Sequence, residues 1–217
     1  MRIGIFHNAY LWRGGEDAVV ALEAELLGKA GVDVKLFTVD NRDARLETLA
    51  GRLRAGLRAR RSPDAARRVA EFLEANPIDL AHVHNFFPLL TPAVHELLHA
   101  RGIPVVQTLH NYRLFCANGA FLREGRNCED CVAAGPWNAV RHACYRGSRA
   151  QTAVWAEATA HHRRLGTFER CVSLFVATSE FARSKLVAAG LDPAKTIVKP
   201  NPVADPGEPS YGGSGAD

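Results

Sequence analysis

Short apolar runs alternate with stretches of helical periodicity along most of the chain. Apolar runs bounded by turn residues are typical of buried strands, whereas apolar positions that recur every three or four residues indicate helices. The runs predict strands over residues 2–6, 32–39, 78–84, 104–109, 172–177 and 196–199. The periodicity predicts helices over residues 16–30, 62–76, 91–102, 150–168 and 179–190. In the first helix the apolar positions are Val19, Val20, Leu22, Leu26 and Leu27.

Strands that alternate with helices favour a parallel sheet with helices on both faces. The pattern therefore predicts an α/β fold, a Rossmann-like doubly wound domain over residues 1–203. Within it, residues 110–148 show no clean period and are predicted to form a long loop, which usually has a function. Residues 204–217 have the Gly, Ser and Pro content of a flexible linker.

Composition narrows the class of protein only a little. With 47% hydrophobic and 23% charged residues, the 217-residue chain can bury a core. A formal net charge of +4 is too small to indicate nucleic-acid binding, but it is compatible with an anionic substrate or membrane surface. No apolar stretch approaches the ~20 residues of a membrane span, and the first run is too short for a signal peptide. We therefore expect a cytoplasmic location, where thiols stay reduced.

The pair Gly14-Gly15 stands directly before the first predicted helix. Glycine lets the backbone approach a ligand closely, and a helix start offers free N–H groups to an anion. Glu16 and Asp17 oppose anion binding there unless their side chains point outward. The alternative interpretation is a flexible turn. Since the pattern is not G-x-G-x-x-G, it does not support nicotinamide or flavin binding.

Two histidine–asparagine pairs follow predicted strands, His84-Asn85 and His110-Asn111. Ligands of open α/β sheets bind outside the carboxyl ends of the strands. A neutral imidazole placed there can donate to a sugar hydroxyl or a phosphate, or act as acid or base. His82 shares a strand face with His84 because side chains alternate with a period of two. The alternative is that these histidines are hydrogen-bonded structural residues.

Four cysteines occur in the long loop, with the spacing C-x11-C-x2-C-x12-C: Cys116, Cys128, Cys131 and Cys144. A C-x2-C pair and two more distant cysteines can surround a structural zinc ion, which would order a segment that is poor in core residues. Reduced surface thiols, or disulfides in an oxidising compartment, are the alternatives. Cys171 begins a predicted strand and is expected in the core.

Residues Arg42–Arg68 hold nine arginines and three acidic residues. Leucines recur there at spacings of three and four, at positions 46, 49, 53 and 57. A basic amphipathic helix of this kind can lie on an anionic membrane surface, which would make the protein peripheral at the inner face of the cell membrane. The alternative is an ordinary solvated helix at the edge of the domain.

Taken together, these segments resemble the amino-terminal domain of family 4 glycosyltransferases, retaining enzymes with two Rossmann-like domains in the GT-B arrangement. The order and spacing of the motifs carry the resemblance over about residues 1–203. The matching segments are residues 3–6 followed by Gly14-Gly15, and then residues 79–85, 104–111, 176–181 and 199–203. Residues 112–144 look like a branch of that family with a cysteine-containing insertion.

The resemblance implies a function and roles for particular residues. The family transfers a sugar from a nucleotide-sugar donor to an acceptor, here a glycan or a lipid-linked sugar of surface polysaccharide synthesis. Gly14 and Gly15 match the loop that approaches the donor diphosphate, and His110 matches the catalytic histidine that touches the donor sugar near the reacting carbon. Ser179 and Glu180 match a Ser-Glu pair that faces the cleft.

The chain departs from the family in one respect, since the carboxyl-terminal donor-binding domain is absent from it. That domain holds most of the nucleotide-sugar site, so we expect little or no transferase activity from this chain alone, as a truncated enzyme or one that needs a second domain in trans. One alternative is a non-catalytic glycan- or protein-binding module stabilised by a metal site of four cysteines. A metal-stabilised scaffold or regulator and an unrelated Rossmann-like enzyme are further alternatives.

Overall fold

The computed structural model describes residues 1–9, 14–40, 48, 60–205 and 207. The greater part of the basic segment 42–68 and of the linker-like tail 204–217 lies outside the described residues. Among the described helices, none has both the length and the apolar composition needed to cross a lipid bilayer.

Six parallel strands form the central sheet in the order β2-β1-β3-β4-β7-β8. Their bounds are Arg2–Ala9 (β1), Asp33–Asp40 (β2), Leu80–Val83 (β3), Val105–Leu109 (β4), Leu174–Ala177 (β7) and Thr196–Val198 (β8). The predicted fold class and each predicted strand are confirmed. The direction of strand order reverses between β1 and β3, which is where open α/β sheets bind ligands.

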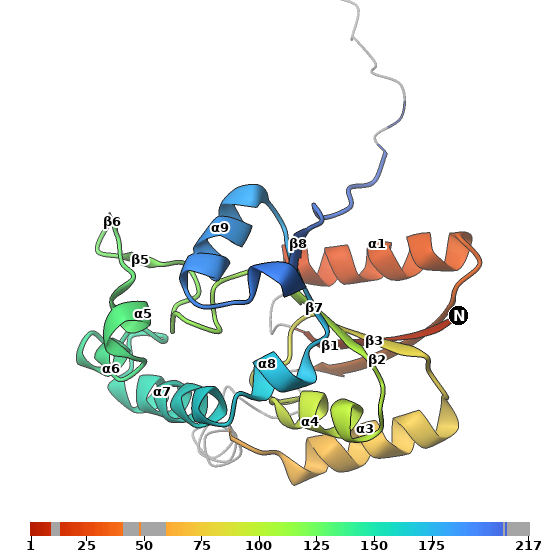
Figure 1. Cartoon of the computed structure of the whole chain (residues 1–217), viewed down its shortest axis with the longest axis horizontal. Helices are drawn as coiled ribbons and strands as arrows, with labels where there is room; N and C mark the ends of the chain where they lie inside the picture. Colours follow the sequence, from red (N-terminus) through yellow and green to blue (C-terminus); the bar gives the residue numbers. More distant parts are fainter. Residues whose placement is uncertain (10–13, 41–47, 49–59, 206, 208–217) are drawn as a thin grey trace, which may run out of the picture.

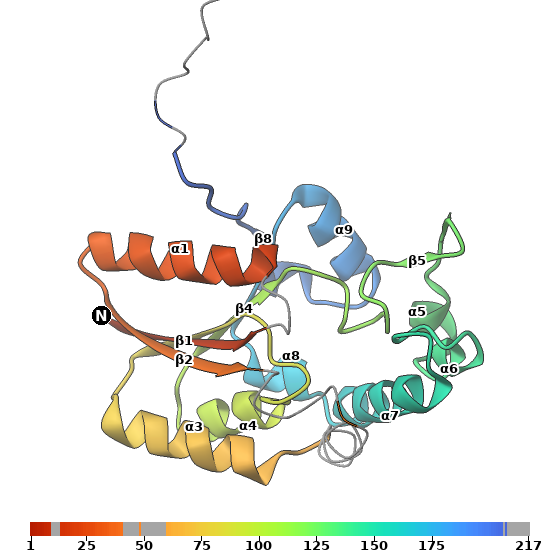
Figure 2. The same cartoon turned by 180° about the vertical axis from the view of Figure 1, so that it is seen from behind.

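Helices cover both faces of the sheet (Figures 1 and 2). On one face lie α1 (Gly15–Lys29) and α9 (Glu180–Ala188), and on the other lie α3 (Pro63–Ala75), α4 (Ala93–Ala100) and α8 (Thr167–Cys171). A 3-10 turn, Pro193–Lys195, precedes β8.

The helix predicted over residues 150–168 is wrong in one respect, because it is two helices. The first, α7 (Arg149–Arg164), ends before Gly166, and α8 begins at the next residue. Gly166 has a left-handed backbone with φ of +57°, which ends the first helix and turns the chain.

The core lies on both faces of the sheet and follows the alternation of the strands. On the face of α3 and α4, Phe6 and Val83 are fully buried with Leu98 of α4. On the opposite face, Ile5 packs with Val20 of α1. Because Ile5 pairs in register with His82, that histidine points to the face of α1.

Residues 110–148 are more ordered than the predicted loop. They contain a small antiparallel hairpin, β5 (Leu122–Arg123) with β6 (Arg126–Asn127), and two short helices, α5 (Asp130–Ala134) and α6 (Asn138–Arg141). An apolar cluster separate from the main core joins this insertion to α7. Its buried members are Ala117, Cys131, Ala139, Trp155 and Ala156. Apolar packing therefore holds at least part of the insertion in place.

Leu98→Ala should lower the free energy of unfolding by about 2–5 kcal/mol, because Leu98 is fully buried and its truncation leaves a cavity. Leu26→Ala on α1 is the matched control, since Leu26 is 45% exposed and alanine favours a helix, so its effect should stay within about 0.5 kcal/mol. Urea denaturation measures both. Equal losses in the two variants would contradict the described core.

Candidate functional site

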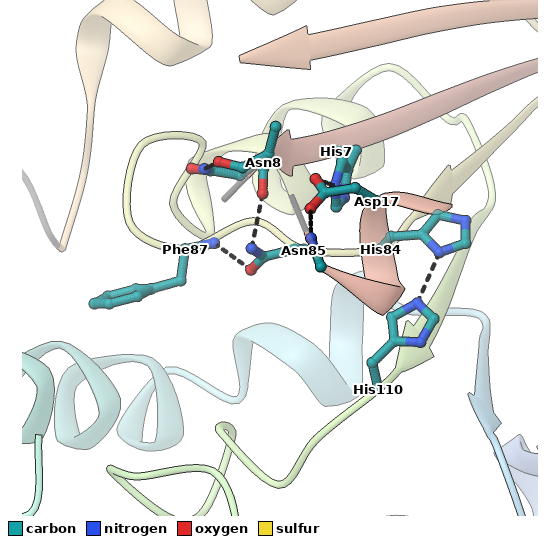
Figure 3. A network of polar contacts seen from close by, with 9 residues as sticks. His7, Asn8, Asp17, His84, Asn85, Phe87 and His110 are labelled. Atoms are coloured by element: carbon teal, nitrogen blue, oxygen red, sulfur yellow. Dashed lines mark hydrogen bonds and ion pairs between the residues drawn. The ribbon is translucent and has the colours of Figure 1, made fainter. Parts of the chain in front are cut away.

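The carboxyl ends of β1, β3 and β4 bring polar side chains together at the point where strand order reverses (Figure 3). His84 and His110, which the sequence singles out on different strands, lie side by side. His84 Nδ1 is 3.0 Å from His110 Nε2, and the two rings stack with centroids 5.3 Å apart. The structure thus joins the two predicted histidines into one pair.

A buried glutamine holds the end of β3 beneath this pair. Gln107 Nε2 donates to the carbonyl oxygen of His84 at 2.6 Å and to that of Thr108 at 2.9 Å. Its Oε1 accepts from His95 Nε2 of α4 at 2.7 Å. Gln107 and its three partners, His84, Thr108 and His95, are all buried, so these hydrogen bonds are costly to break. They fix the strand ends relative to α4.

Burial keeps the histidine pair uncharged. It lowers the pKa of His84 well below 6.5, and the nearby His82 and His110 lower it further. Burial also lowers the pKa of His110, although the carboxylate of Glu16 opposes that shift. At neutral pH the two imidazoles are therefore neutral, so one donates to the other, and the tautomer of the pair decides what His110 offers to a ligand.

Asn85 uses its side chain on the protein itself. Its Nδ2 donates to the carbonyl oxygen of Asn8 at 2.8 Å, and its Oδ1 accepts from the N–H of Phe87 at 3.1 Å (Figure 3). These bonds tie the end of β1 to the turn after β3. The geometry gives Asn85 a structural part, and the prediction that it binds a ligand stays a prediction.

The acidic residues after Gly14-Gly15 do not point outward. Asp17 accepts from His7 Nε2 at 2.9 Å and from the N–H of Gly14 at 2.8 Å, and Glu16 accepts from Asn111 Nδ2 at 2.9 Å. Both carboxylates thus fold back onto the strand ends. Space remains beside Gly15, where a Cβ would meet no atom within 4 Å.

A cavity of about 90 Å³ opens between these strand ends and α7. His84, His110 and Asn111 contribute to its polar side. Its other walls are mainly apolar and aromatic: Phe86, Phe87, Leu114, Phe115, Trp155 and Phe168. A mostly apolar hollow with a few convergent polar groups is the usual form of a small-molecule site.

Two arginines also line this cavity, Arg113 and Arg163. The guanidinium of Arg163 lies 5.0 Å from the ring centre of Phe115, and that of Arg113 lies 5.5 Å from the ring centre of Tyr145. Burial lowers the pKa of Arg163, which means that its charge is poorly solvated. An anionic group of a ligand would restore a partner to that charge.

A model of the glycosyl transferase 4-like domain family matches residues 14–202, which is most of the chain. The chain belongs to this glycosyl transferase 4-like family. The family match confirms the resemblance that the sequence motifs carry. No curated protein matches this glycosyl transferase 4-like domain.

Several solved structures are similar to it at low identity. UDP-GlcNAc 2-epimerase from Neisseria meningitidis, bound to UDP-GlcNAc, is 13% identical with a TM-score of 0.47, over 91% of this chain and 45% of that one. S. aureus MnaA with UDP is 11% identical, with a TM-score of 0.48, over 91% and 43%. Anabaena HepE with UDP and glucose is 15% identical, with a TM-score of 0.44, over 93% and 44%. This chain spans less than half the length of each, and likenesses this distant do not assign a function.

Ser179 and Glu180 of the glycosyl transferase 4-like domain lie apart from the cavity. Ser179 caps α9, where its Oγ accepts from the N–H of Ala182 at 3.1 Å, and both residues are exposed. They follow β7 and so stand on the same edge of the sheet as His110, but they do not line the same hollow. Their predicted place in a cleft stays a prediction.

Sequence reasoning missed three residues of the site: His7, Glu23 and Lys199. His7 was missed because β1 continues to Ala9 rather than ending at residue 6. Glu23 is buried against His82 and His84, with its Oε1 3.2 Å from Lys199 Nζ. A signal for Glu23 exists, since it stands three positions after the core residue Val20 on α1.

The four cysteines of the insertion are free thiols. Cys116 Sγ donates to Asn118 Oδ1 at 2.9 Å, and burial, then the nearby thiolates, raise the pKa of Cys131 to about 11. All four cysteines are among the described residues, and no three of their sulfurs lie within 4.8 Å of one another. A zinc ion on them stays a prediction. Cys171 is buried, as expected.

The domain should lose stability in acid through His95. Burial lowers the pKa of His95 from 6.5 to about 4. Between these values the unfolded chain binds a proton that the native chain does not, so the free energy of unfolding falls as the pH falls, by up to about 1.4 kcal/mol per pH unit for this group. His95→Gln removes the contribution, and urea denaturation across this pH range should show a shallower pH dependence.

His99→Gln is the control, because His99 is exposed on the same helix. It should keep the pH dependence of the wild-type protein. If His95→Gln also keeps it, His95 does not titrate as described.

Proposed function

We propose that this chain is the acceptor-side domain of a retaining glycosyltransferase, which transfers a sugar from a nucleotide-sugar donor to a glycan or lipid-linked acceptor. The observation that carries the proposal is the cavity, because it joins the His84–His110 pair to an apolar wall and two arginines. Membership of the glycosyl transferase 4-like family supports the reaction class.

The cavity favours an acceptor in which an anionic group is attached to an apolar chain. The rings of Phe115 and Trp155 offer contact area rather than hydrogen bonds, and Arg113 and Arg163 offer positive charge. A free glycan would need more donors and acceptors along the wall, since its hydroxyl groups lose water on binding. A polyprenyl diphosphate, alone or carrying a sugar, has the required chemistry.

In this proposal His110 touches the donor sugar near the reacting carbon, while Gly14 and Gly15 approach the donor diphosphate. His110 Nδ1 is buried and has no hydrogen-bond partner among the described residues, which leaves it for a ligand. A second domain, in the same polypeptide or in trans, completes the donor site, so the 217-residue chain alone has little or no activity. Turnover of UDP-glucose by this chain alone contradicts that part.

One observation favours a second candidate, a module that binds a glycan or lipid-linked glycan without catalysis. The carboxylates of Glu16 and Asp17 occupy the strand edge beside Gly14-Gly15 and add negative charge where a diphosphate would come. Transfer in an assembly with a donor-binding domain would exclude this candidate.

Farnesyl diphosphate should bind the 217-residue chain and UDP-glucose should not, as measured by calorimetric titration. Arg163→Gln should weaken the binding of farnesyl diphosphate by roughly 10- to 150-fold, because it removes a charge-assisted contact worth about 1.5–3 kcal/mol. Arg164→Gln is the matched control, since Arg164 is exposed on the same helix and donates to the carbonyl oxygen of Ala160. Equal weakening by both variants, or no binding, contradicts the acceptor site.

His110→Ala should lower transfer by about 100-fold or more in an assembly that includes a donor-binding domain, which is the size of effect that a positioned imidazole contributes. Transfer of radiolabelled sugar to the acceptor measures the change, with circular dichroism to establish folding. His142→Ala, at an exposed histidine of the insertion, should keep the wild-type rate. A wild-type rate in His110→Ala removes His110 from the catalytic machinery.

A further inference from the structure

A second polar cluster shares His84 with the histidine pair and lies between β3 and α1. His82 and His84 occupy alternate positions of the chain at β3, so both point to α1, where Glu23 meets them. Glu23 Oε1 is 3.5 Å from His82 Nδ1, and Glu23 Oε2 is 3.7 Å from His84 Nε2. Among the described residues this is the one group in which three such side chains have ligand atoms within 4.8 Å of one another.

The atoms that face one another in this cluster lack sufficient partners. His84 Nε2 and Glu23 Oε2 are buried without a hydrogen bond to any described residue. An unsatisfied buried polar atom is costly, so a native protein usually supplies a water molecule or an ion. The 3.7 Å separation of the two atoms is too long for a hydrogen bond.

The far side of each imidazole is anchored. His82 Nε2 lies 2.7 Å from Thr108 Oγ1, and His84 Nδ1 lies 3.0 Å from His110 Nε2. Histidines that bind metals use their second nitrogen in this way, because the outer hydrogen bond fixes the orientation and tautomer of the ring. Both rings are thus held with one nitrogen directed to Glu23.

We propose that Glu23, His82 and His84 bind a divalent transition-metal ion such as Zn²⁺. Two imidazoles and one carboxylate are a donor set that zinc uses, and buried neutral imidazoles are ready to bind. Bonds of about 2.0–2.1 Å in a tetrahedron place ligand atoms roughly 3.3 Å apart. The two separations between carboxylate and imidazole, 3.5 and 3.7 Å, exceed that by only a few tenths of an ångström, and all three ligand atoms lie within 4.8 Å of one another.

Lys199 competes with the metal for Glu23. Its Nζ lies 3.2 Å from Glu23 Oε1, and its side chain is 44% exposed, so it can turn into solvent. Lys199 begins the segment Lys199-Pro200-Asn201-Pro202, which follows β8. The ammonium group of Lys199 therefore lowers the affinity of the site for the metal.

Metal binding also fixes the tautomer of His110. With the metal on His84 Nε2, the proton of neutral His84 is on Nδ1 and is donated to His110 Nε2. The proton of neutral His110 is then on its own Nδ1, so His110 offers a donor to a ligand in the cavity. The metal thus influences the cavity through His84 and His110 without contacting the ligand.

The first test is a titration of the chelator-treated 217-residue chain with ZnCl₂ at neutral pH, followed by zinc X-ray absorption. We expect one bound zinc ion with nitrogen and oxygen neighbours at about 2.0–2.1 Å. His82→Gln and Glu23→Gln should each weaken binding at least tenfold, while His162→Gln, at a buried histidine outside the cluster, should leave it unchanged. Sulfur neighbours at about 2.3 Å would place the ion on the cysteines and overturn the proposal, as would the absence of binding.

The second test does not depend on variants that empty the buried cluster. Lys199→Met should tighten zinc binding about tenfold, because it removes the competing ammonium from a half-exposed position. Lys195→Met is the control, since Lys195 donates to backbone carbonyl oxygens of Glu169 and Val172 instead. Unchanged or weaker zinc binding in Lys199→Met means that Lys199 is only the ion-pair partner of Glu23, and the proposal fails.

Discussion

The carboxyl edge of the sheet depends on histidines that are buried and still uncharged. Removing an imidazolium from water is so unfavourable that burial lowers the pKa of His82 and of His95 to about 4. A neutral imidazole keeps one donor and one acceptor, and both need partners inside the protein. Gln107 supplies part of that need by bonding His95 and the backbone of His84 at once, so the strand ends take up one fixed arrangement.

This arrangement divides the polar residues into two groups. Asn85 and Asp17 use their side chains on backbone groups or on His7, so they hold the site in shape. His110 keeps one ring nitrogen without a partner among the described residues, and Arg163 carries a poorly solvated charge. Groups of the second kind gain most from a ligand, because their present surroundings leave them unsatisfied. The candidate chemistry therefore rests on His110 and Arg163.

The alternation of apolar runs and helical periods predicts the sheet and its helices correctly, because burial against a parallel sheet dictates that pattern. It does not predict which face of α1 is buried. Leu26 is 45% exposed and Glu23 is 8% exposed, the reverse of an apolar-face prediction. The reason lies far away in sequence, since Glu23 meets His82 and His84 on β3. Periodicity reflects only local spacing, so it cannot predict such contacts between segments that are distant in sequence. The ion pair of Lys199 with Glu23 is another contact of this kind.

The two halves of the cavity rest on different interactions. Hydrogen bonds around Gln107 position the polar side, whereas the apolar wall packs partly with the main core, through Phe86, Phe115 and Phe168, and partly with the separate cluster of α7 and the insertion, through Trp155. Trp155 connects the two parts, because it is a member of that cluster, lines the cavity and donates to the carbonyl oxygen of Arg113 at 3.2 Å. Since substitutions in separate clusters have nearly additive effects on stability, Trp155 and its neighbours in the insertion can change with little energetic coupling to His84 and His110. Under the proposed function, choice of acceptor would then rest with Trp155 and the insertion, and reactivity with the edge of the sheet.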